Sequence, residues 1–510
     1  MRDTSVTVSD GSVRDEARGV GRKAHRGLKW SLAGTICTNV VRLVTIPVLG
    51  RLISPAEFGL VAAALVIIAF GQVVRDVGMG AAIVQRETLT RPQIDAAASF
   101  SVIFGTAVGL VVFAAAPVVA RLDDSPSLTA MIRALAAMFV IRSLGTVPRA
   151  LCQRDLEFRA LTIIDFGSYF AGSVVTIVLA AMGASVWALI IGYLVESVTS
   201  TAAVFVLRPT RLRWTRAIAD SRGLFHFGLG STLGDLASYF ANNGDYMIVG
   251  YSLGNEPLGL YTRAYELMRF PSAVFSNVAG FVLFSAFSRL QGSPERLGRA
   301  FRHGTFLTAV ILLPASAALI VVAPEMIRLL LGNGWGEAVF PFQILAASMM
   351  ARTAFKIGLT LARGAGAVYA VAIASGMNAV LVFVGAAIGS HWGIVGVSVA
   401  ISIECTLQYV WFCVLGLKQT TLGWPSLVAI HVEAVLAAVV GLAAVIPIAT
   451  GLRSIGASDA VIVIGCGVAG LFGLMVAAVI GKVRSHADWL WIWEAARNQL
   501  LRRQGATRSA

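Results

Sequence analysis

We select six basic side chains that stand inside long apolar stretches of the sequence, where an unpaired charge is costly. They are Arg42, Arg142, Arg263, Arg269, Arg352 and Lys356. A charge in the hydrocarbon core of a bilayer costs about 2.5–3.5 kcal/mol or more unless it is paired or hydrated. The planar fork of arginine makes paired hydrogen bonds to phosphate and carboxylate oxygens. We therefore expect these cations to line a cavity that binds an anionic headgroup.

Structural ion pairing is the alternative for the same cations. Arg263 is three residues from Glu266, and Arg42 is expected at the same membrane depth as Asp245. Lys356 has a stem long enough to reach the membrane surface. Arg352 and Lys356 are four residues apart and share a helix face.

Acids and an amide also fall within apolar stretches and could take part in ion coupling. The four that we select are Asp235, Asp245, Glu404 and Asn378, and Asp165 and Glu196 are also within such stretches. A carboxylate beside amide or carbonyl oxygens can hold Na⁺ or carry a proton. The alternative is a hydrogen bond that ties neighbouring helices together. We expect no cofactor, apart from possible Na⁺ or H⁺ coupling.

Motifs of enzymatic catalysis are missing from the sequence. It holds no Walker A sequence, no HExxH and no GxSxG. The five cysteines lack the spacing of a metal site. We therefore expect no enzyme activity and no metal centre, and transport would use an ion gradient, the membrane potential or the substrate gradient.

The composition requires these residues to be positioned by membrane-spanning helices. Hydrophobic residues make up 57% of the 510, and charged residues only 13%, against roughly 25% in a soluble domain. The net charge of +14 does not indicate nucleic acid, because the basic residues lie between apolar runs and form no single patch. The fold class predicted is an all-α integral membrane protein.

About fourteen apolar segments are long enough to span a bilayer. They are 28–50, 58–76, 96–120, 127–148, 161–181, 185–207, 224–249, 257–284, 304–324, 338–360, 367–388, 394–415, 429–450 and 459–480. With the N-terminus inside, cytoplasmic segments hold 29 of the 41 Lys and Arg residues and outer loops hold four. This bias predicts a multi-pass protein with both termini in the cytoplasm.

An internal repeat relates the two halves of the chain at an offset of 200 residues. Gly50, Gly59, Leu60 and Ala64 recur as Gly250, Gly259, Leu260 and Ala264, and Ser31 and Gly34 recur as Ser231 and Gly234. Six helices separate the copies, and an even number preserves orientation. We therefore expect two six-helix bundles related by an axis along the membrane normal, enclosing a central cavity, with two further C-terminal helices.

The resulting domain organisation has six parts. They are a cytoplasmic N-terminal segment (1–27), an N-lobe (28–207), a cytoplasmic linker (208–223), a C-lobe (224–415), a final helix pair (429–480) and a cytoplasmic amphipathic tail (481–510). In the tail, Trp489, Trp493, Ala496 and Leu500 fall on one helical face. This pattern is typical of a helix on an anionic membrane surface, and a solvated tail with an aromatic anchor is the alternative.

Three stretches resemble one family of membrane proteins. They are GLKWSLAGTICTNVVRLVTIPVLGRLISPAEFGLVAAALVI from Gly27, DVGMGAAIVQR from Asp76, and Pro148-Arg149-Ala150 followed by Asp155-Leu156-Glu157-Phe158-Arg159. The sequence resembles Wzx-type polysaccharide flippases of the multidrug/oligosaccharidyl-lipid/polysaccharide exporter superfamily, in the colanic acid and exopolysaccharide exporter branch. In architecture it is also similar to lipid II flippases.

The resemblance implies a flippase in the bacterial inner membrane. Its cargo would be an undecaprenyl-diphosphate-linked oligosaccharide repeat unit for exopolysaccharide, lipopolysaccharide or capsule, moved by alternating access. Arg42 and Arg263 match helices that carry essential cations in lipid II flippases, and Asp235 and Asn378 match helices where some relatives bind Na⁺. Membrane lipids are implied partners, and polysaccharide polymerase and chain-length proteins are candidate ones.

Two other functions remain open at this stage. A cation-coupled drug or metabolite exporter of the same superfamily would need a more acidic or apolar cavity with few arginines. A non-transporting membrane scaffold of a polysaccharide assembly complex would have no use for charges inside helices.

Overall fold

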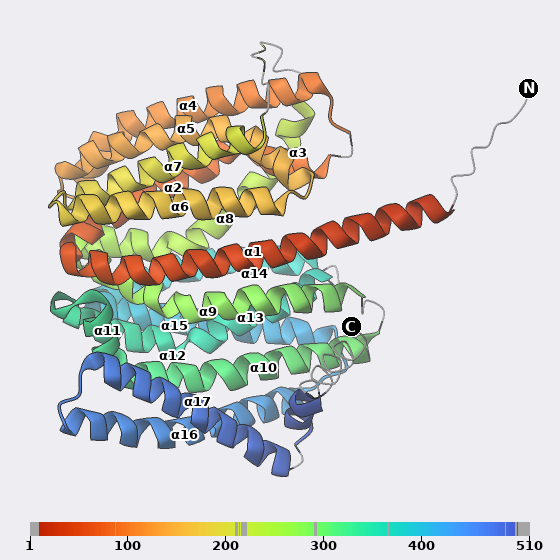
Figure 1. Ribbon diagram of the computed structural model, residues 1–510, viewed down its shortest axis with the longest axis vertical. Helices are drawn as coiled ribbons and strands as arrows, with labels where there is room; N and C mark the ends of the chain where they lie inside the picture. Colours follow the sequence, from red (N-terminus) through yellow and green to blue (C-terminus); the bar gives the residue numbers. More distant parts are fainter. Residues whose placement is uncertain are drawn as a thin grey trace, which may run out of the picture. The chain divides into compact units, whose positions relative to one another are not determined.

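The computed structural model describes residues 10–86, 88–209, 213, 215, 222–289, 293–364, 367–484, 486–494 and 497. Within these ranges every regular element is helical (Figure 1). The first half contains α1 (Asp10–Leu52), α2 (Pro55–Asp76), α3 (Met79–Gln85), α4 (Arg91–Leu122), α5 (Ser127–Arg154), α6 (Phe158–Ala181), α7 (Val186–Leu207) and α8 (Arg222–Leu253).

The second half of the chain continues the helical pattern. It contains α9 (Asn255–Arg289), α10 (Pro294–Val321), α11 (Ala323–Leu331), the 3₁₀-helix η2 (Asn333–Ala338), α12 (Val339–Ala347), α13 (Met349–Gly364), α14 (Val368–Gly389), the 3₁₀-helix η3 (Ser390–Trp392), α15 (Gly393–Lys418), α16 (Trp424–Ser454) and α17 (Asp459–Val483). The predicted segment 338–360 is thus divided between η2, α12 and α13.

Eleven stretches of the described chain are long and apolar enough to cross a membrane. One of them, Ala370–Lys418, contains both α14 and α15, which are separated by η3. Gly393 ends this turn at φ 66°, a left-handed conformation that glycine adopts without a Cβ clash. The predicted segments 224–249 and 257–284 correspond to α8 and α9, which are not among the eleven.

The chain divides into two compact units. Unit 1 comprises residues 1–53 and 60–239, and unit 2 comprises 54–59 and 240–510. In unit 1, α4 packs on α5, α6 packs on α7, and α1 lies along α6. In unit 2, α13 packs on α9 and α15, and α10 packs on α16, which in turn pairs with α17. The first eighteen residues of α8 belong to unit 1.

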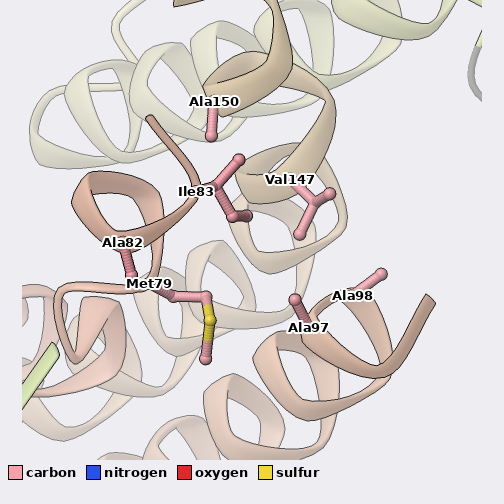
Figure 2. Close-up of a cluster of buried hydrophobic side chains, with 7 residues drawn as sticks. All are labelled: Met79, Ala82, Ile83, Ala97, Ala98, Val147 and Ala150. Carbon is pink, nitrogen blue, oxygen red and sulfur yellow. The ribbon is translucent and has the colours of Figure 1, made fainter. Parts of the chain in front are cut away.

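A small apolar core holds the short helix α3 in unit 1. Met79, Ala82 and Ile83 of α3 pack against Ala97 and Ala98 of α4 and Val147 and Ala150 of α5 (Figure 2). Ile83 is fully buried. Four of the seven side chains are alanines, which lets the helices approach closely. This packing fixes α3 and the turn before it beside α5.

The described part of the tail packs against helices of unit 2. Neither the membrane-surface helix nor the solvated tail that the sequence suggests includes this contact. Residues 487–494 are helical, and Trp489 is only 3% exposed. Its ring meets Phe306 edge-to-face and its Nε1 donates to Glu433 Oε2 at 3.3 Å. A Cβ on Gly481 would lie 2.2 Å from this ring. Trp489 is therefore unavailable to a membrane surface, because protein already covers it. Ala496 and Leu500 lie outside the described residues.

Candidate functional site

A polar cavity of about 650 Å³ lies within unit 1. Its walls come from α1, α2, α3, α5, α6, α7 and α8, together with the turn before α3. The charged lining residues are Arg75, Asp76, Arg142, Arg149, Asp165, Glu196 and Asp235. Its volume is in the range of small-molecule binding sites. Hydroxyl and amide groups of Thr38, Thr146, Gln153, Ser168, Tyr169, Ser200 and Thr201 complete its polar surface.

Arg142 bridges three helices at the cavity wall. Its Nε donates to Ser197 Oγ at 3.0 Å, and its Nη2 lies 3.8 Å from Glu196 Oε1 on α7. Nη1 reaches Gln72 Oε1 on α2 at 3.5 Å. About a third of the side chain remains exposed. This arginine is therefore oriented by the protein while still open to the cavity.

Arg75 and Asp76 enter the cavity from a strained turn at the end of α2. Val77 has φ 36° and Gly78 has φ 58°. A positive φ is unfavourable for a β-branched residue, and such strain is concentrated at functional sites. Arg75 Nε donates to Asp76 Oδ1 at 2.9 Å, whereas its buried Nη1 has no hydrogen-bond partner among the described residues. Gly105 leaves room for this side chain, because a Cβ there would lie 3.2 Å from Arg75 Cγ.

The cavity is balanced in charge. Arg149 Nη2 donates to Asp165 Oδ1 at 2.6 Å, so a second arginine of α5 pairs with an acid of α6. Three arginines and four carboxylates, including Asp235, line the cavity. The predicted cationic character therefore does not apply to the cavity of unit 1.

Arg42 lies beside this cavity. Its guanidinium carbon stands 5.8 Å from the ring centre of Tyr169, a lining residue, and it is close enough to Glu196 for their charges to interact. Arg42, Arg142 and Asp235 are thus the predicted site residues that the structure gathers around one cavity.

A second polar cluster lies in unit 2 around three mutually packed tyrosines, Tyr246, Tyr261 and Tyr265, whose ring centres are 5.4–5.9 Å apart. Asp245 is 2% exposed and accepts hydrogen bonds from the Tyr261 hydroxyl at 2.8 Å and from the Tyr246 N–H at 3.0 Å. Asp245 therefore makes the kind of hydrogen bond between neighbouring helices that the alternative to ion coupling requires.

Arg352 and Glu404 belong to the same cluster. Arg352 donates to the Tyr265 hydroxyl and stands 4.5 Å from that ring's centre. It is also close enough to Glu404 for their charges to interact. Glu404 Oε2 accepts from the Cys405 thiol at 3.3 Å. Arg352 Nε and Glu404 Oε1 have no hydrogen-bond partner among the described residues.

The other predicted residues of unit 2 are more dispersed. Arg263 pairs with Glu266, as the structural alternative predicts, and lies 4.0 Å from the ring centre of Phe58. Arg269 is exposed and faces Tyr265 at 5.8 Å. Lys356 is exposed on α13.

Asn378 lies on α14 in unit 2, and its buried Oδ1 has no partner among the described residues. Asp235, the other residue matched to sodium-binding helices, lines the cavity of unit 1. No group of three or more His, Cys, Asp or Glu side chains that could hold a metal occurs in the described part of the chain.

Arg75, Asp76 and Arg149 are cavity charges that were not among the candidates predicted from the sequence, whereas Asp165 and Glu196, named there without being selected, line the same cavity. Arg149 is placed in a cytoplasmic loop because the apolar run ends at 148, but α5 continues to Arg154 and carries it along the cavity. Arg75 and Asp76 close the second apolar run just before a glycine-rich turn. An adjacent pair of opposite charges at such a turn is the signal that could have identified them.

Comparisons with known proteins give a consistent result. A family model described as polysaccharide biosynthesis protein matches residues 48–340. The lipopolysaccharide biosynthesis protein WzxC of Escherichia coli (strain K12) is 28% identical over 325 residues, which cover 63% of this chain and 66% of WzxC. The succinoglycan biosynthesis transport protein ExoT of Rhizobium meliloti (strain 1021) is 26% identical, covering 63% and 65%. The match thus spans about two thirds of these relatives.

Solved structures show the same fold. The lipid II flippase MurJ in an inward closed conformation has a TM-score of 0.74 at 11% identity, covering 89% of this chain and 99% of MurJ. An inward-facing multidrug resistance MATE family transporter has a TM-score of 0.60 at 17% identity, covering 75% and 94%. At these identities the likeness concerns the fold alone, and it confirms the predicted all-helical membrane architecture.

Proposed function

Because the chain belongs to the polysaccharide biosynthesis protein family, as its sequence predicted, we propose that it is a flippase for a lipid-linked oligosaccharide. It is a multi-pass membrane protein of polysaccharide biosynthesis. Its cargo in this proposal is an undecaprenyl-diphosphate-linked repeat unit, moved from the cytoplasmic to the outer leaflet of the bacterial inner membrane. The names of WzxC and ExoT, which refer to polysaccharide biosynthesis and transport, support this cargo class.

The observation that carries the proposal is the polar cavity of unit 1. It is about 650 Å³ in volume, and five of the helices in its wall, α1, α2, α5, α6 and α7, are long and apolar enough to span a membrane. Seven charged groups and seven other polar side chains line it. Charges in a membrane segment are retained where they line a pathway or bind a substrate. A hydrated headgroup can cross such a cavity while its lipid tail stays in the bilayer.

Alternating access in many transporters uses a repeated architecture, and one reciprocal contact supports such an architecture. A Cβ on Gly59 would lie 1.6 Å from Asn255 O, and a Cβ on Gly259 would lie 1.9 Å from Pro55 O. Positions 55 and 59 correspond to 255 and 259 at the offset of 200 residues. Such exchange of equivalent contacts is characteristic of a two-fold relation. We therefore retain two six-helix bundles, two C-terminal helices and cytoplasmic termini as part of the proposal.

Ion coupling, in this proposal, uses the carboxylates of Glu404 and Asp235 and the amide of Asn378. Glu404 and Asn378 each present an oxygen without a partner among the described residues. Asp235 lies in the cavity wall of unit 1. These groups would carry a proton or hold Na⁺, while Arg42, Arg142, Arg263, Arg269, Arg352 and Lys356 would contact the cargo or position the helices that do.

Deletion of the gene tests the proposed function. We expect complete lipid-linked repeat units to accumulate in the cytoplasmic leaflet and surface polymer to disappear. Lipid intermediates are measured by mass spectrometry of extracts, and their sidedness by a glycosidase added outside spheroplasts. Unchanged polymer and intermediates would contradict the proposal.

A cation-coupled drug or metabolite exporter is the second candidate. The four carboxylates in the cavity of unit 1 favour it. In that case the same deletion would leave the polymer intact and raise drug sensitivity.

A further inference from the structure

We propose that the cavity of unit 1 receives the hydroxyl-bearing sugars of the cargo and not its diphosphate. This inference rests on the proposed function and specifies which chemical part of the cargo the cavity binds. It follows from the charges, the hydrogen-bonding groups and the partners of the lining residues.

The charge balance argues against a diphosphate. Each lining arginine already faces a carboxylate: Asp76 for Arg75, Glu196 for Arg142 and Asp165 for Arg149. Asp235 adds a fourth acid. A diphosphate would meet these carboxylates at close range, where like charges repel. Its own charges would have to displace existing ion pairs to reach an arginine.

The hydrogen-bonding inventory suits sugar hydroxyls instead. A hydroxyl both donates and accepts, and an arginine–carboxylate pair presents donors and acceptors side by side. Thr146, Gln153, Ser200 and Thr201 extend this mixture across the wall. Tyr169 adds an aromatic ring beside Arg42.

One buried hydrogen-bond donor belongs to a lining residue of the cavity and is unsatisfied among the described residues. The Arg75 side chain is only 9% exposed, and its Nη1 has no hydrogen-bond partner among the described residues. A buried donor without a partner is costly, and Arg75 lines the cavity, so we expect its side chain to turn Nη1 toward an oxygen of a bound ligand. Because Asp76 already neutralises this guanidinium, an uncharged hydroxyl can accept that hydrogen bond with no charge of its own.

Charged thiol reagents test the electrostatic part. The exposed Cys37 is replaced by serine, Thr146→Cys or Ser200→Cys is introduced, and the purified full chain is used in detergent. The reaction rates with cationic (trimethylammonium)ethyl methanethiosulfonate and anionic sulfonatoethyl methanethiosulfonate are compared with their rates on free mercaptoethanol. We expect the cationic reagent to react at least as fast as the anionic one after this correction.

The measured labelling rates decide whether the cavity attracts anions. A cationic cavity would accelerate the anionic reagent by about tenfold or more, and this would overturn the inference. So would a failure of both thiols to react, since the cavity would then be closed to water. In the matched variants, Glu196→Gln should favour the anionic reagent and Arg142→Gln should favour the cationic one.

Protection from labelling tests the sugar itself. The repeat-unit oligosaccharide, released from the host's polymer by mild acid, should slow labelling at millimolar concentration, whereas inorganic pyrophosphate should not. Protection by pyrophosphate, or none by the oligosaccharide, contradicts the inference. Because the rate comparison needs no transport, it remains informative even if the deletion experiment refutes the flippase.

Discussion

At the scale of single residues, pairing explains most of the charges within the helices. Arg142 contacts Glu196 and Ser197, Arg263 contacts Glu266, and Asp245 accepts from Tyr261. A paired charge can still contact cargo if its surroundings are open, as they are for Arg142. Structural pairing and cargo binding are therefore compatible roles for the same side chain.

Replacement of Arg142 tests this dual role. We expect Arg142→Ala to abolish polymer export and to lower the free energy of unfolding by about 1–3 kcal/mol, because Glu196 loses its partner. Adding Glu196→Gln should recover part of the stability but not the export. Thermal unfolding in detergent and polymer yield measure the two effects separately.

Arg133→Ala is the matched control for this experiment. Arg133 is on the same helix, stands 4.9 Å from the Phe113 ring centre and is not a lining residue of the cavity. Export should persist in this variant at a normal protein level. If Arg142→Ala also exports normally, Arg142 does not bind cargo.

At the scale of helices, the positions that the proposed repeat relates meet in a backbone contact. α2 and α9 approach so closely at Gly59 and Gly259 that no side chain fits between them. α2 begins shortly after α1 ends at Leu52, and α9 begins shortly after α8 ends at Leu253. The glycines are therefore required by packing and not by backbone conformation.

A side chain at this contact should be poorly tolerated. We expect Gly259→Ala to lower the melting temperature and export together, since Pro55 O would lie 1.9 Å from the new Cβ. Gly376→Ala in α14 is the control, because nothing lies within 4 Å of its Cβ position. That control should be neutral or stabilising by up to about 1 kcal/mol. Equal melting temperatures for the two variants would refute the close contact.

The tail helix is held by a buried carboxylate. Asp488 is 1% exposed and accepts hydrogen bonds from Arg302 Nε at 2.9 Å and Nη2 at 2.7 Å. His303 and His486 lie 3.6 and 3.8 Å from the same carboxylate, and Glu433 lies 3.8 Å from His486. Burial acts against the charged form, but the contacts with His303 and Arg302 hold the pKa of Asp488 below its ordinary value.

The lowered pKa fixes the sign of the pH dependence. A depressed carboxyl pKa stabilises the docked tail above the ordinary pKa, and this stabilisation is lost as pH falls through the folded value. The opening of residues 486–494, measured as amide hydrogen exchange relative to the intrinsic exchange rate at each pH, should therefore be unchanged between neutral pH and pH ~5 and rise only in stronger acid. Asp488→Asn should raise it already at neutral pH. Glu494→Gln, an exposed acid of the same helix, should not.

At the scale of the whole molecule, apolar runs predicted the all-helical membrane fold class, and the resemblance of three sequence stretches predicted the family. The runs located the helices, but α5 extends six residues past its run at 148, because a helix continues wherever one face remains packed. Because Arg149 lies beyond the apolar run, the sequence did not predict that it lines the cavity. The packing of Trp489 was also hidden, since a tryptophan pattern suits a membrane surface and a protein groove equally well. Pairings such as Arg142 with Glu196 are set by packing between helices, which a single sequence does not reveal.

The membrane orientation is the last prediction, and it follows from charge. Lys418 precedes α16, Lys482 lies in the last turn of α17 and Arg484 follows it. At the opposite ends of these two helices the basic residue is Arg453, in the last turn of α16. Basic flanks stay in the cytoplasm. Alkaline phosphatase inserted at Ile455 should be active, because that enzyme folds only outside the cytoplasm. The same insertion at Leu422, and a fusion after Ala510, should be inactive, while green fluorescent protein at those two positions should fluoresce. An active phosphatase after Ala510 would mean that the number of spans is odd or that the chain is inverted, and the assignment of a cytoplasmic start for the cargo would then be reversed or lost.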